Sequence, residues 1–446
     1  MFDKMKTESN CFLCNFNKVD ITPDKPVYLS GFANRSDKSS GIHLPLLSLC
    51  LLVGGGKNRV CIISNDFMEL APEIVEFISE QIAKKTELDK TDIFIHSIHT
   101  HSAPVMSEML LKNTSSSGND IYRELTIQKI IDNAVKTVNE KESYTKCSLK
   151  VGVGESALGI CRRAIDPETG LSVIGKKSSS NAKQKLYVME FKDTSGKPYI
   201  TAVNYACHPV TLHENNLAVS SDYVGVARNK IEEKLNSNVI FLNGAAGDIN
   251  PDFPMGNDTE ITSEAGRLLA EDVLRLSYKN IDYAGIISEC IELHLPYKNR
   301  NMTSSFIDDE VERKSSEKTD FYDWPTDLKS WAETMKAKLD KGQLINYRKT
   351  KIGAVKLSNI ILFFSQGEIF SKYQDELRSQ FPEYAVLFVG YTGCEAGYLP
   401  DYDSFKNGGY EVEQAYVYLL EPSPLSIESC NIYAEKSNQL ICDVIK

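Results

Sequence analysis

Short apolar runs typical of β-strands alternate along this chain with segments whose apolar residues recur at helical spacing. Residues 47–53 and 60–64 are two such β-rich runs, and the glycines and polar residues at 54–58 between them predict a hairpin. The run 60–64, the helical pattern over 72–85 and the run 93–95 then predict a βαβ crossover.

The same two periodicities continue to the carboxyl end of the chain. Further strands are predicted at residues 149–153, 186–191, 199–206, 239–242, 286–295, 352–355, 360–365 and 385–391. Further helices are predicted around residues 127–135, 222–235, 262–276, 328–339 and 424–445, and one more from residue 367. The pattern predicts the α/β class, with a mixed sheet at the core of a single large domain that carries insertions.

The run 93–95 leads into the motif IHSIHTHSAP, residues 95–104. Strand side chains alternate between two faces, so we expect His99 and His101 to point the same way and His96 to point the other way. Pro104 ends the strand because proline cannot donate to a ladder. Two imidazoles at the carboxyl end of a strand predict a site, although histidines that merely fill polar pockets are the alternative.

A second strand-end motif follows residues 199–206 and contains Cys207, His208 and Pro209. The strand 239–242 leads into NGAAGDINP, whose small residues allow a close backbone approach. Glu368, in SQGE at a predicted strand-to-helix turn, offers a carboxylate, although the helix dipole also favours an acidic residue there. The loop 28–45, rich in Gly, Ser and Asn, is expected to cover the site.

Two or three imidazoles and a carboxylate that converge from separate strands are the ligands that a zinc site requires. Such a site keeps one position open for a water, whose pKa the metal lowers towards neutrality. Asp66, Asp222 and Asp248 are expected to accept hydrogen bonds from backbone amides, with the alternative that one of them orients a ligand histidine. The remaining histidines are expected to be structural: His43, His96, His213 and His294.

Composition narrows the choice of partners. A net charge of −11 and a pI of about 5.3, without a basic stripe, argue against nucleic acid. No apolar run reaches the length of a membrane span and the start lacks a secretion signal, so the expectation is a soluble cytoplasmic protein. Eleven scattered cysteines indicate reduced thiols, and Cys11 and Cys14 form a lone CxxC with little specificity.

Six motifs occur in this order: IHTHSAP, NYACHPVTL, SSDYVG, NGAAGDINP, SQGE and GYLPDYDSFKNGGYEVE. Together they resemble the catalytic domain of the neutral, non-lysosomal ceramidase family, over nearly the whole chain. The resemblance implies a zinc amidase that cleaves the N-acyl bond of ceramide into a fatty acid and a sphingoid base. The expected catalytic domain spans residues 19–446, after a loose leader at 1–18, with a polar insertion or boundary near 298–319.

The resemblance also implies roles for individual residues. One zinc ion per chain would be held by His99, His208, Glu368 and Tyr398. Catalytic or substrate-contacting roles would fall to His101, Tyr410, Arg162 and Asn250, with Arg163 as the alternative for the arginine. Tyr398 and Tyr410 reproduce the spacing of twelve residues (410 − 398) between the family's two tyrosines.

Asn250 departs from the family pattern, because the family motif GDxSP has a serine where this chain has GDINP. Asn cannot act as a nucleophile, but its amide can hold a substrate carbonyl or a developing oxyanion. The chain as it stands is also expected to lack the immunoglobulin-like carboxyl-terminal domain of ceramidases. The substrate is therefore either a lipid N-acyl compound such as ceramide or a smaller amide or ester, and a zinc-retaining binding protein without turnover is the third alternative.

Overall fold

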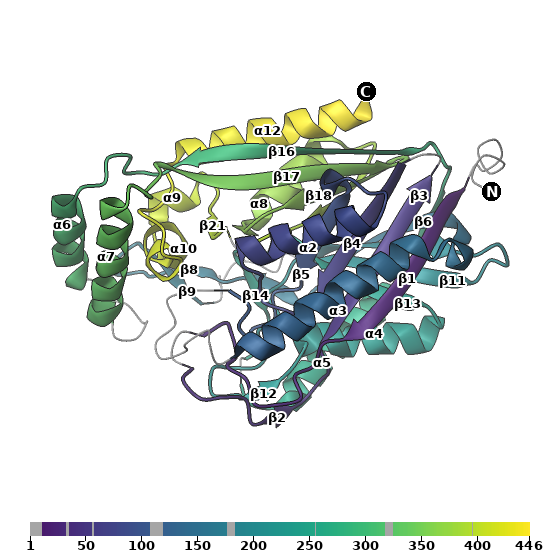
Figure 1. Ribbon diagram of the computed structural model, residues 1–446, viewed down its shortest axis with the longest axis horizontal. Helices are drawn as coiled ribbons and strands as arrows, with labels where there is room; N and C mark the ends of the chain where they lie inside the picture. Colours follow the sequence, from purple (N-terminus) through teal and green to yellow (C-terminus); the bar gives the residue numbers. More distant parts are fainter. Residues whose placement is uncertain are drawn as a thin grey trace.

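The structure is a computed structural model that describes residues 11–446 except 33–34, 56–57, 108–118, 176–182, 255, 317–323 and 395. Two β-sheets lie face to face, and helices cover the outer face of each, so that the chain builds four layers in the order α/β/β/α (Figure 1). Both sheets combine parallel and antiparallel neighbours. The predicted α/β class with a mixed sheet core is confirmed.

The larger sheet has nine strands within the described residues, in the order β13-β11-β10-β6-β1-β3-β4-β5, with β15 beside β6. Its strands are β1 Phe12–Asp20, β3 Leu47–Gly55, β4 Asn58–Asn65, β5 Ile93–Ser97, β6 Thr145–Ser156, β10 Gln184–Lys192, β11 Pro198–Tyr205, β13 Asn238–Asn243 and β15 Tyr278–Ile281. Antiparallel pairs form its middle. The two ends are the parallel pairs β4–β5 and β11–β13, each of which requires a crossover helix.

The smaller sheet has the order β16-β17-β18-β20. Its strands are β16 Ile286–Pro296, β17 Tyr347–Leu357, β18 Ile360–Ser365 and β20 Ala385–Val389. Short paired strands lie outside both sheets: β2 Gly41–Ile42 with β12 Ala218–Val219, β7 Gly159–Cys161 with β14 Ile249–Pro251, β8 Arg163–Ile165 with β9 Ser172–Ile174, and β19 Glu368–Ile369 with β21 Tyr398–Leu399. Two of these short pairs carry candidate site residues.

Alternation of side chains along each strand divides the core between the layers. In β3, Leu51 points into the space between the sheets, whereas Leu52 faces the helices outside. In β20, Leu387 and Phe388 divide in the same way. Stacked rings of Phe94 and Phe364, with centroids 4.0 Å apart, join the two sheets directly. Burial of apolar surface between the sheets therefore fixes how one sheet lies on the other.

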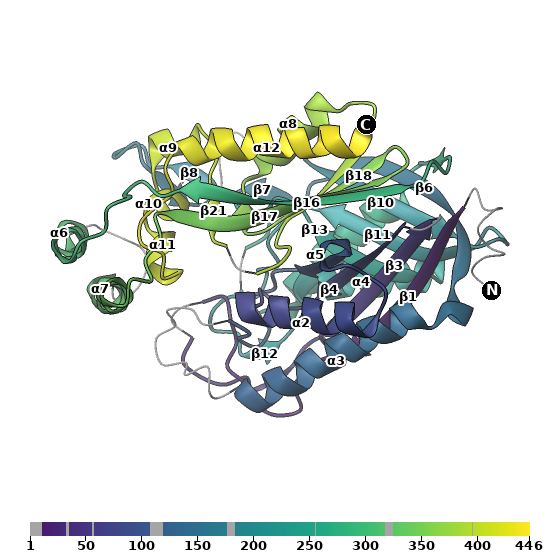
Figure 2. The same ribbon diagram turned by 45° about the horizontal axis from the view of Figure 1, so that its top comes forward.

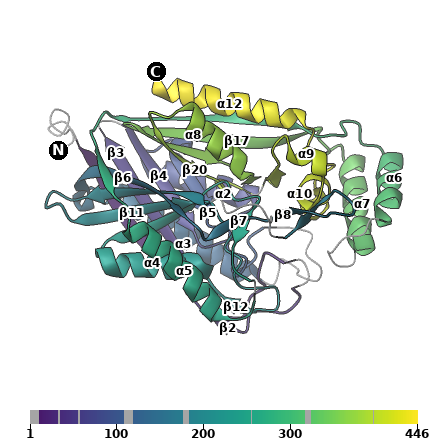
Figure 3. The same ribbon diagram turned by 180° about the vertical axis from the view of Figure 1, so that it is seen from behind.

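Helices cover the outer faces of the sheets in pairs. The larger sheet is covered by α2 Pro72–Lys85 with α3 Asp120–Asn139, and by α4 Asp222–Leu235 with α5 Thr259–Leu274, the second pair being clearest from behind (Figure 3). The smaller sheet is covered by α8 Ser371–Gln380 and α12 Glu428–Ile445. No helix in the described part of the chain is long and apolar enough to cross a membrane.

A second group of helices lies at one side of the layers. The helices α6 Ser304–Ser315 and α7 Trp324–Asp340 pack together and are seen end-on in Figure 2. Three short helices lie between this pair and the smaller sheet: α9 Ser404–Asn407, α10 Tyr410–Glu413 and α11 Ala415–Tyr418. Residues of α11 pack against α7, so the pair α6–α7 is anchored next to the segment that carries the predicted tyrosines.

The local predictions near the amino-terminal half are largely confirmed. The predicted hairpin is β3–β4, and the predicted βαβ crossover is β4–α2–β5. The expected loose leader at 1–18 is wrong for residues 12–18, which lie in β1, because Phe12, Cys14 and Phe16 alternate into the core between the sheets. Residues 1–10 lie outside the described residues.

Three predictions in the second half need correction. The polar segment 298–319 is not merely a linker, since residues Ser304–Ser315 form α6 and bury Ile307 against α7. The helix predicted from residue 367 begins at Ser371, because Glu368 and Ile369 form β19. The helix predicted from residue 424 begins at Glu428. The single catalytic domain over residues 19–446 stays a prediction.

Asp66 and Arg228 form a buried ion pair between β4 and α4. Arg228 donates to both carboxylate oxygens, at 3.0 and 2.7 Å, and the two side chains are 0% and 2% exposed. Asp66 also accepts a hydrogen bond from Leu47 N at 2.8 Å, which confirms its expected role as an acceptor of backbone amides. The pair ties the end of β4 to a helix that covers the opposite end of the same sheet.

Arg228→Leu is expected to lower the free energy of unfolding by about 3–5 kcal/mol, because it leaves the Asp66 carboxylate buried without a positive partner. Urea unfolding monitored by circular dichroism measures the loss. Arg267→Leu in α5 is the matched control, since the Arg267–Glu271 pair lies at the surface and contributes less than about 1 kcal/mol. Equal losses in the two variants would contradict the assignment.

Candidate metal centre

His99 and His101 lie just after β5, in a loop rather than in the strand. The strand ends at Ser97, and His99 has a φ of 71°, in the left-handed region that non-glycine residues rarely adopt. The prediction that strand alternation aligns the two rings is therefore wrong. The rings nevertheless converge, with centroids 5.1 Å apart, because the turn at His99 redirects the chain.

His208 follows β11 and meets His99 at the carboxylate of Glu368. Glu368 Oε2 lies 3.0 Å from His208 Nε2 and 3.4 Å from His99 Nε2. On the other side of each ring, Nδ1 faces a backbone carbonyl: that of Met68 at 3.0 Å from His99, and that of Ile249 at 3.1 Å from His208. Each Nδ1 therefore donates its hydrogen to a carbonyl and each Nε2 presents a lone pair.

Glu368 is brought to the rings by the small parallel pair β19–β21, in which it lies opposite Tyr398. Because the helix begins three residues later, a helix dipole does not explain this acidic residue. Burial would raise the pKa of Glu368, but the neighbouring His99 and His208 outweigh it and hold that pKa well below its usual value. The carboxylate is therefore ionised.

The donor set fits a metal ion. Two imidazole lone pairs directed at one ionised carboxylate require a positive charge between them. A third ring, His101, offers a nitrogen within 4.8 Å of nitrogens of the other two, and neither of its ring nitrogens has a hydrogen-bond partner among the described residues. Burial lowers the pKa of His208 to about 4, so this imidazole is neutral at pH 7 and free to coordinate.

Arg162 connects the predicted tyrosine, asparagine and histidine. Its guanidinium donates to Tyr398 Oη at 3.1 Å and lies 3.4 Å from both His208 Nε2 and Asn250 Oδ1. Tyr410 places its ring 5.7 Å from that of Tyr398 in an edge-to-face contact. Burial and the Glu368 charge raise the pKa of Tyr398 well above its usual value, so its phenol is protonated unless a metal ion draws off the proton.

All eight predicted site residues therefore gather in one region. His99, His208, Glu368 and Tyr398 form its centre, and His101, Arg162, Tyr410 and Asn250 surround them. The structure also distinguishes the two neighbouring arginines, since Arg162 contacts the tyrosine and histidine whereas Arg163 does not contact either in the described hydrogen bonds. The roles of these residues stay a prediction.

Glu411 is a buried partner of this group that sequence analysis missed. Its carboxylate accepts from Arg162 Nε at 3.0 Å and from Arg163 Nη1, and its side chain is 1% exposed. Arg163 also donates to the Gly408 carbonyl at 2.7 Å. Glu411 therefore holds both guanidinium groups, and Arg162 is thereby aimed at the site. The sequence offered little sign of this contact. It shows two adjacent arginines and, far along the chain, an acidic residue next to Tyr410.

Tyr391 is the second residue that sequence analysis missed. It follows β20, has a φ of 52°, and lays its ring on His99 with centroids 4.3 Å apart and an interplanar angle of 30°. His99 and Tyr391 both have left-handed backbone conformations, and each such conformation costs about 1–3 kcal/mol of folding free energy. Strained backbone of this kind is common at functional sites. Here it accompanies the ring contact that holds the His99 imidazole in place.

The loop 28–45 covers His101, as predicted. Phe32 makes an edge-to-face contact with the His101 ring at 5.2 Å, and Arg35 donates to the His101 carbonyl at 2.7 Å. Gly31, with a φ of 101°, passes so close to His101 that any β-carbon there would lie 2.4 Å from its side chain. A glycine is therefore required at residue 31.

The glycine-rich motif NGAAGDINP approaches protein backbone rather than an open pocket. A β-carbon on Gly247 would lie 2.5 Å from the Glu368 carbonyl, and Gly247 N donates to Ile369 O at 3.0 Å. Asp248 accepts from the backbone and hydroxyl of Ser371. The motif thus packs against β19 and the start of α8, and Asp248 accepts a hydrogen bond from a backbone amide, as predicted.

The remaining acidic and histidine side chains have the structural roles that the sequence predicts. Asp222 accepts from the amides of residues 211 and 212. His96 is buried, with Nδ1 at the Gly390 carbonyl and Nε2 accepting from Asn243 N. His43 contacts Ser220 Oγ at 3.1 Å. None of these three side chains reaches the candidate metal centre through a described hydrogen bond.

Residues 12–265 match the family described as neutral/alkaline non-lysosomal ceramidase, N-terminal, which is more than half of the chain. The chain belongs to this family. Neutral ceramidase B of Dictyostelium discoideum is 23% identical over 297 residues, or 64% of this chain and 40% of that protein. This chain therefore spans about 40% of the length of that relative.

Two solved structures share the fold. One is neutral ceramidase from Pseudomonas aeruginosa, with a TM-score of 0.65 and 14% identity, over 96% of this chain and 75% of that chain. The other is described as a ceramidase complexed with C2, with a TM-score of 0.69 and 14% identity, over 96% and 74% of the two chains. At this identity the likeness shows the fold.

The family match covers only some of the candidate ligands. His99, His101, Arg162, His208 and Asn250 lie within residues 12–265. Glu368, Tyr398 and Tyr410 lie beyond them, in the part of the chain that forms the smaller sheet and the helices beside it. Their placement at the site therefore rests on the geometry of the structure.

His208→Ala is expected to lower the affinity for zinc by at least about a hundredfold, because it removes one of the two imidazoles that meet the Glu368 carboxylate. Atomic absorption on dialysed protein measures the bound metal. His294→Ala is the matched control, since this histidine is half exposed and its side chain contacts Glu292 and Tyr347, away from the candidate metal centre. Full zinc content in His208→Ala would exclude it as a ligand.

Glu411→Gln is expected to destabilise the protein by about 3–5 kcal/mol, because it leaves two buried guanidinium groups without a negative partner while keeping the shape of the side chain. Urea unfolding measures the loss. Glu413→Gln, at an exposed position two residues along the same segment, is expected to change stability by less than about 0.5 kcal/mol. Similar stability of the two variants would contradict the role given to Glu411.

Proposed function

We propose that this protein is a zinc-dependent amidohydrolase that cleaves an N-acyl amide bond, with ceramide-like lipids as the substrate class. Family membership supports the reaction, and the convergence of His99 Nε2 and His208 Nε2 on one Glu368 oxygen is the observation that carries the proposal. A buried set of imidazole nitrogens and a carboxylate suits zinc better than the harder divalent ions, which prefer oxygen ligands.

His99, His208 and Glu368 would hold the ion, with Tyr398 as the fourth donor. When bound, zinc supplies a Lewis acid that polarises the acyl carbonyl and acidifies a water. The protein's own contribution starts with its neutral imidazoles, whose Nδ1 hydrogens are already committed to carbonyls, so that both rings are oriented before any ligand arrives.

His101 is the residue suited to move a proton. Its ring lies beside His99 and His208, and burial lowers its pKa well below the usual value. A neutral imidazole can accept a proton at Nε2 or Nδ1 and pass it to the leaving amine, which must be protonated before it departs. Phe32 and Gly31 close off the ring from the side of the loop 28–45.

Arg162, Asn250 and Tyr410 are suited to hold the acyl oxygen. Arg162 is buried and its pKa is raised well above the usual value: burial opposes this, but the neighbouring Tyr398, Glu411 and Glu368 outweigh it. It therefore keeps a permanent positive charge beside the reacting group. With its oxygen turned to Arg162, Asn250 keeps its amide hydrogens as donors to an oxyanion.

Asn250 also supports a second candidate, hydrolysis of a smaller, non-lipid amide or ester at the same centre. The family motif has a serine at this position, so the contacts to the head of the substrate differ here from those of ceramidases. A panel of zinc-loaded reactions, with short-chain and long-chain N-acylsphingosines, small N-acyl amides, esters and dipeptides, separates the two candidates. Acid release from none of these substrates would leave a zinc-binding protein without turnover.

Asn250→Ala is expected to lower turnover about a hundredfold while the zinc content stays unchanged, because it removes an oxyanion donor but no ligand. Release of fatty acid from the best substrate of the panel, measured beside zinc content, checks both parts. Asn250→Ser restores the family residue and serves as the comparison. Unchanged turnover in Asn250→Ala would remove this residue from the mechanism.

A further inference from the structure

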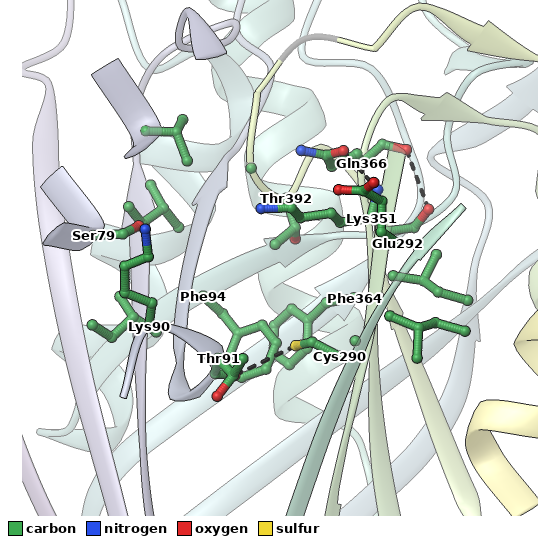
Figure 4. Close-up of a pocket in the computed structure, with 18 of the residues that line it drawn as sticks. Ser79, Lys90, Thr91, Phe94, Cys290, Glu292, Lys351, Phe364, Gln366 and Thr392 are labelled. Atoms are coloured by element: carbon green, nitrogen blue, oxygen red, sulfur yellow. Dashed lines mark hydrogen bonds between the residues drawn. The ribbon is translucent and has the colours of Figure 1, made fainter. Parts of the chain in front are cut away.

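A cavity of about 340 Å³ lies between the two halves of the molecule, outside the candidate metal centre. One wall comes from α2 and the approach to β5, and the other comes from β16, β17 and the end of β18 (Figure 4). Thr392 and Gly393 also line it, whereas the preceding residue, Tyr391, packs on His99. Its volume falls in the range of small-molecule sites, about 300–1,000 Å³.

The base of the cavity is apolar. The stacked rings of Phe94 and Phe364 form it (Figure 4), and Ile95 and Ile352 also line the cavity. Gly353 makes this stack possible, since a β-carbon there would lie 2.6 Å from Phe94 and 2.9 Å from Cys290 Sγ. The base of the cavity is therefore an apolar surface on which an alkyl chain can pack. It lies at the edge of the hydrophobic core between the two sheets.

Four charged side chains line the cavity, and three of them are already paired. Lys90 bonds to Glu76, and Glu292 bonds to Lys349 at 2.8 Å. The fourth, Lys351 on β17, has no carboxylate within 4.0 Å among the described residues. Lys351 is close enough for its charge to act on Glu76, which Lys90 already pairs. An ammonium group that forms no ion pair of its own, beside an apolar surface, is complementary to an anion that carries an apolar chain.

We propose that this cavity binds a medium-chain fatty carboxylate, with its chain on the Phe94–Phe364 pair and its carboxylate at Lys351 Nζ. A fatty acid is also the product class of the reaction proposed above, and only this biological connection rests on the proposed function. Binding itself requires no turnover and no metal.

The site lies next to the candidate metal centre along the chain. Gly393 N donates to Ile95 O at 2.6 Å, and Thr392 bridges to His96, so the segment 391–393 is fastened to the strand that leads to His99. A ligand in the cavity thus touches residues that are one peptide away from the ring that fixes His99.

Isothermal titration of the full chain with octanoate, octanol and octylamine tests the proposal. Octanoate is expected to bind most tightly, and Lys351→Met is expected to weaken octanoate about tenfold while it leaves octanol unchanged. Lys356→Met is the matched control on the same strand, because its Nζ bonds to Ile445 O outside the cavity. Cys290→Phe is expected to abolish binding of all three ligands, because the added ring fills the cavity. Phenylalanine is also well tolerated in a β-strand such as β16.

Two further measurements locate the ligand. A photoreactive octanoate analogue is expected to label residues that line the cavity, such as Thr91 and Cys290, and to leave the exposed Cys442 unlabelled, as mass spectrometry of the peptides would show; this readout needs no variant to fold. His208→Ala is expected to bind octanoate as well as the wild type does, whether or not the protein hydrolyses amides. Loss of binding in His208→Ala would place the carboxylate at the metal centre instead.

Three further results would overturn the proposal: no saturable binding of octanoate at millimolar concentration, equal affinity for octylamine, or octanoate affinity unchanged by Lys351→Met. None of them bears on the proposed hydrolase, which is measured separately by release of acid in the substrate panel.

Discussion

The apolar contact between the two sheets is the constraint on which the candidate site depends. His99 and His208 follow strands of the larger sheet, whereas Glu368 and Tyr398 belong to a short pair of strands beside the smaller sheet. Nothing in the local sequence brings these groups together. Rings such as Phe94 and Phe364, packed between the sheets, set the distance at which a carboxylate from one side faces two imidazoles from the other.

Charge balance inside the site follows from the same packing. Arg162 and Arg163 meet the carboxylate of Glu411, and Arg228 meets that of Asp66. The Glu368 carboxylate differs from these two, because it faces imidazoles that are tied to carbonyls through Nδ1. A buried carboxylate that faces two ring nitrogens makes this position suited to an added cation.

Sequence patterns predicted helices and strands well where the hydrophobic period was clear and the contacts joined residues close in sequence. The hairpin β3–β4 and the crossover β4–α2–β5 could be predicted because each depends on neighbouring residues. The site residues could be identified only through ordered motifs, since their geometry depends on contacts distant in sequence. Tyr391, Glu411 and the left-handed turn at His99 could not be predicted, because a positive φ in a non-glycine residue and a distant ion pair leave no periodic signal.

The wide separation of the donors along the chain has a consequence for folding. His99 and Glu368 are 269 residues apart (368 − 99), so they meet only when the chain closes a very long loop, at a large cost in conformational entropy. A metal ion that needs donors from both sheets can bind only after the two sheets have packed together. Its binding free energy then stabilises the native state and not a partly folded one. Metal supply would thus act on the lifetime of the native protein as well as on its chemistry.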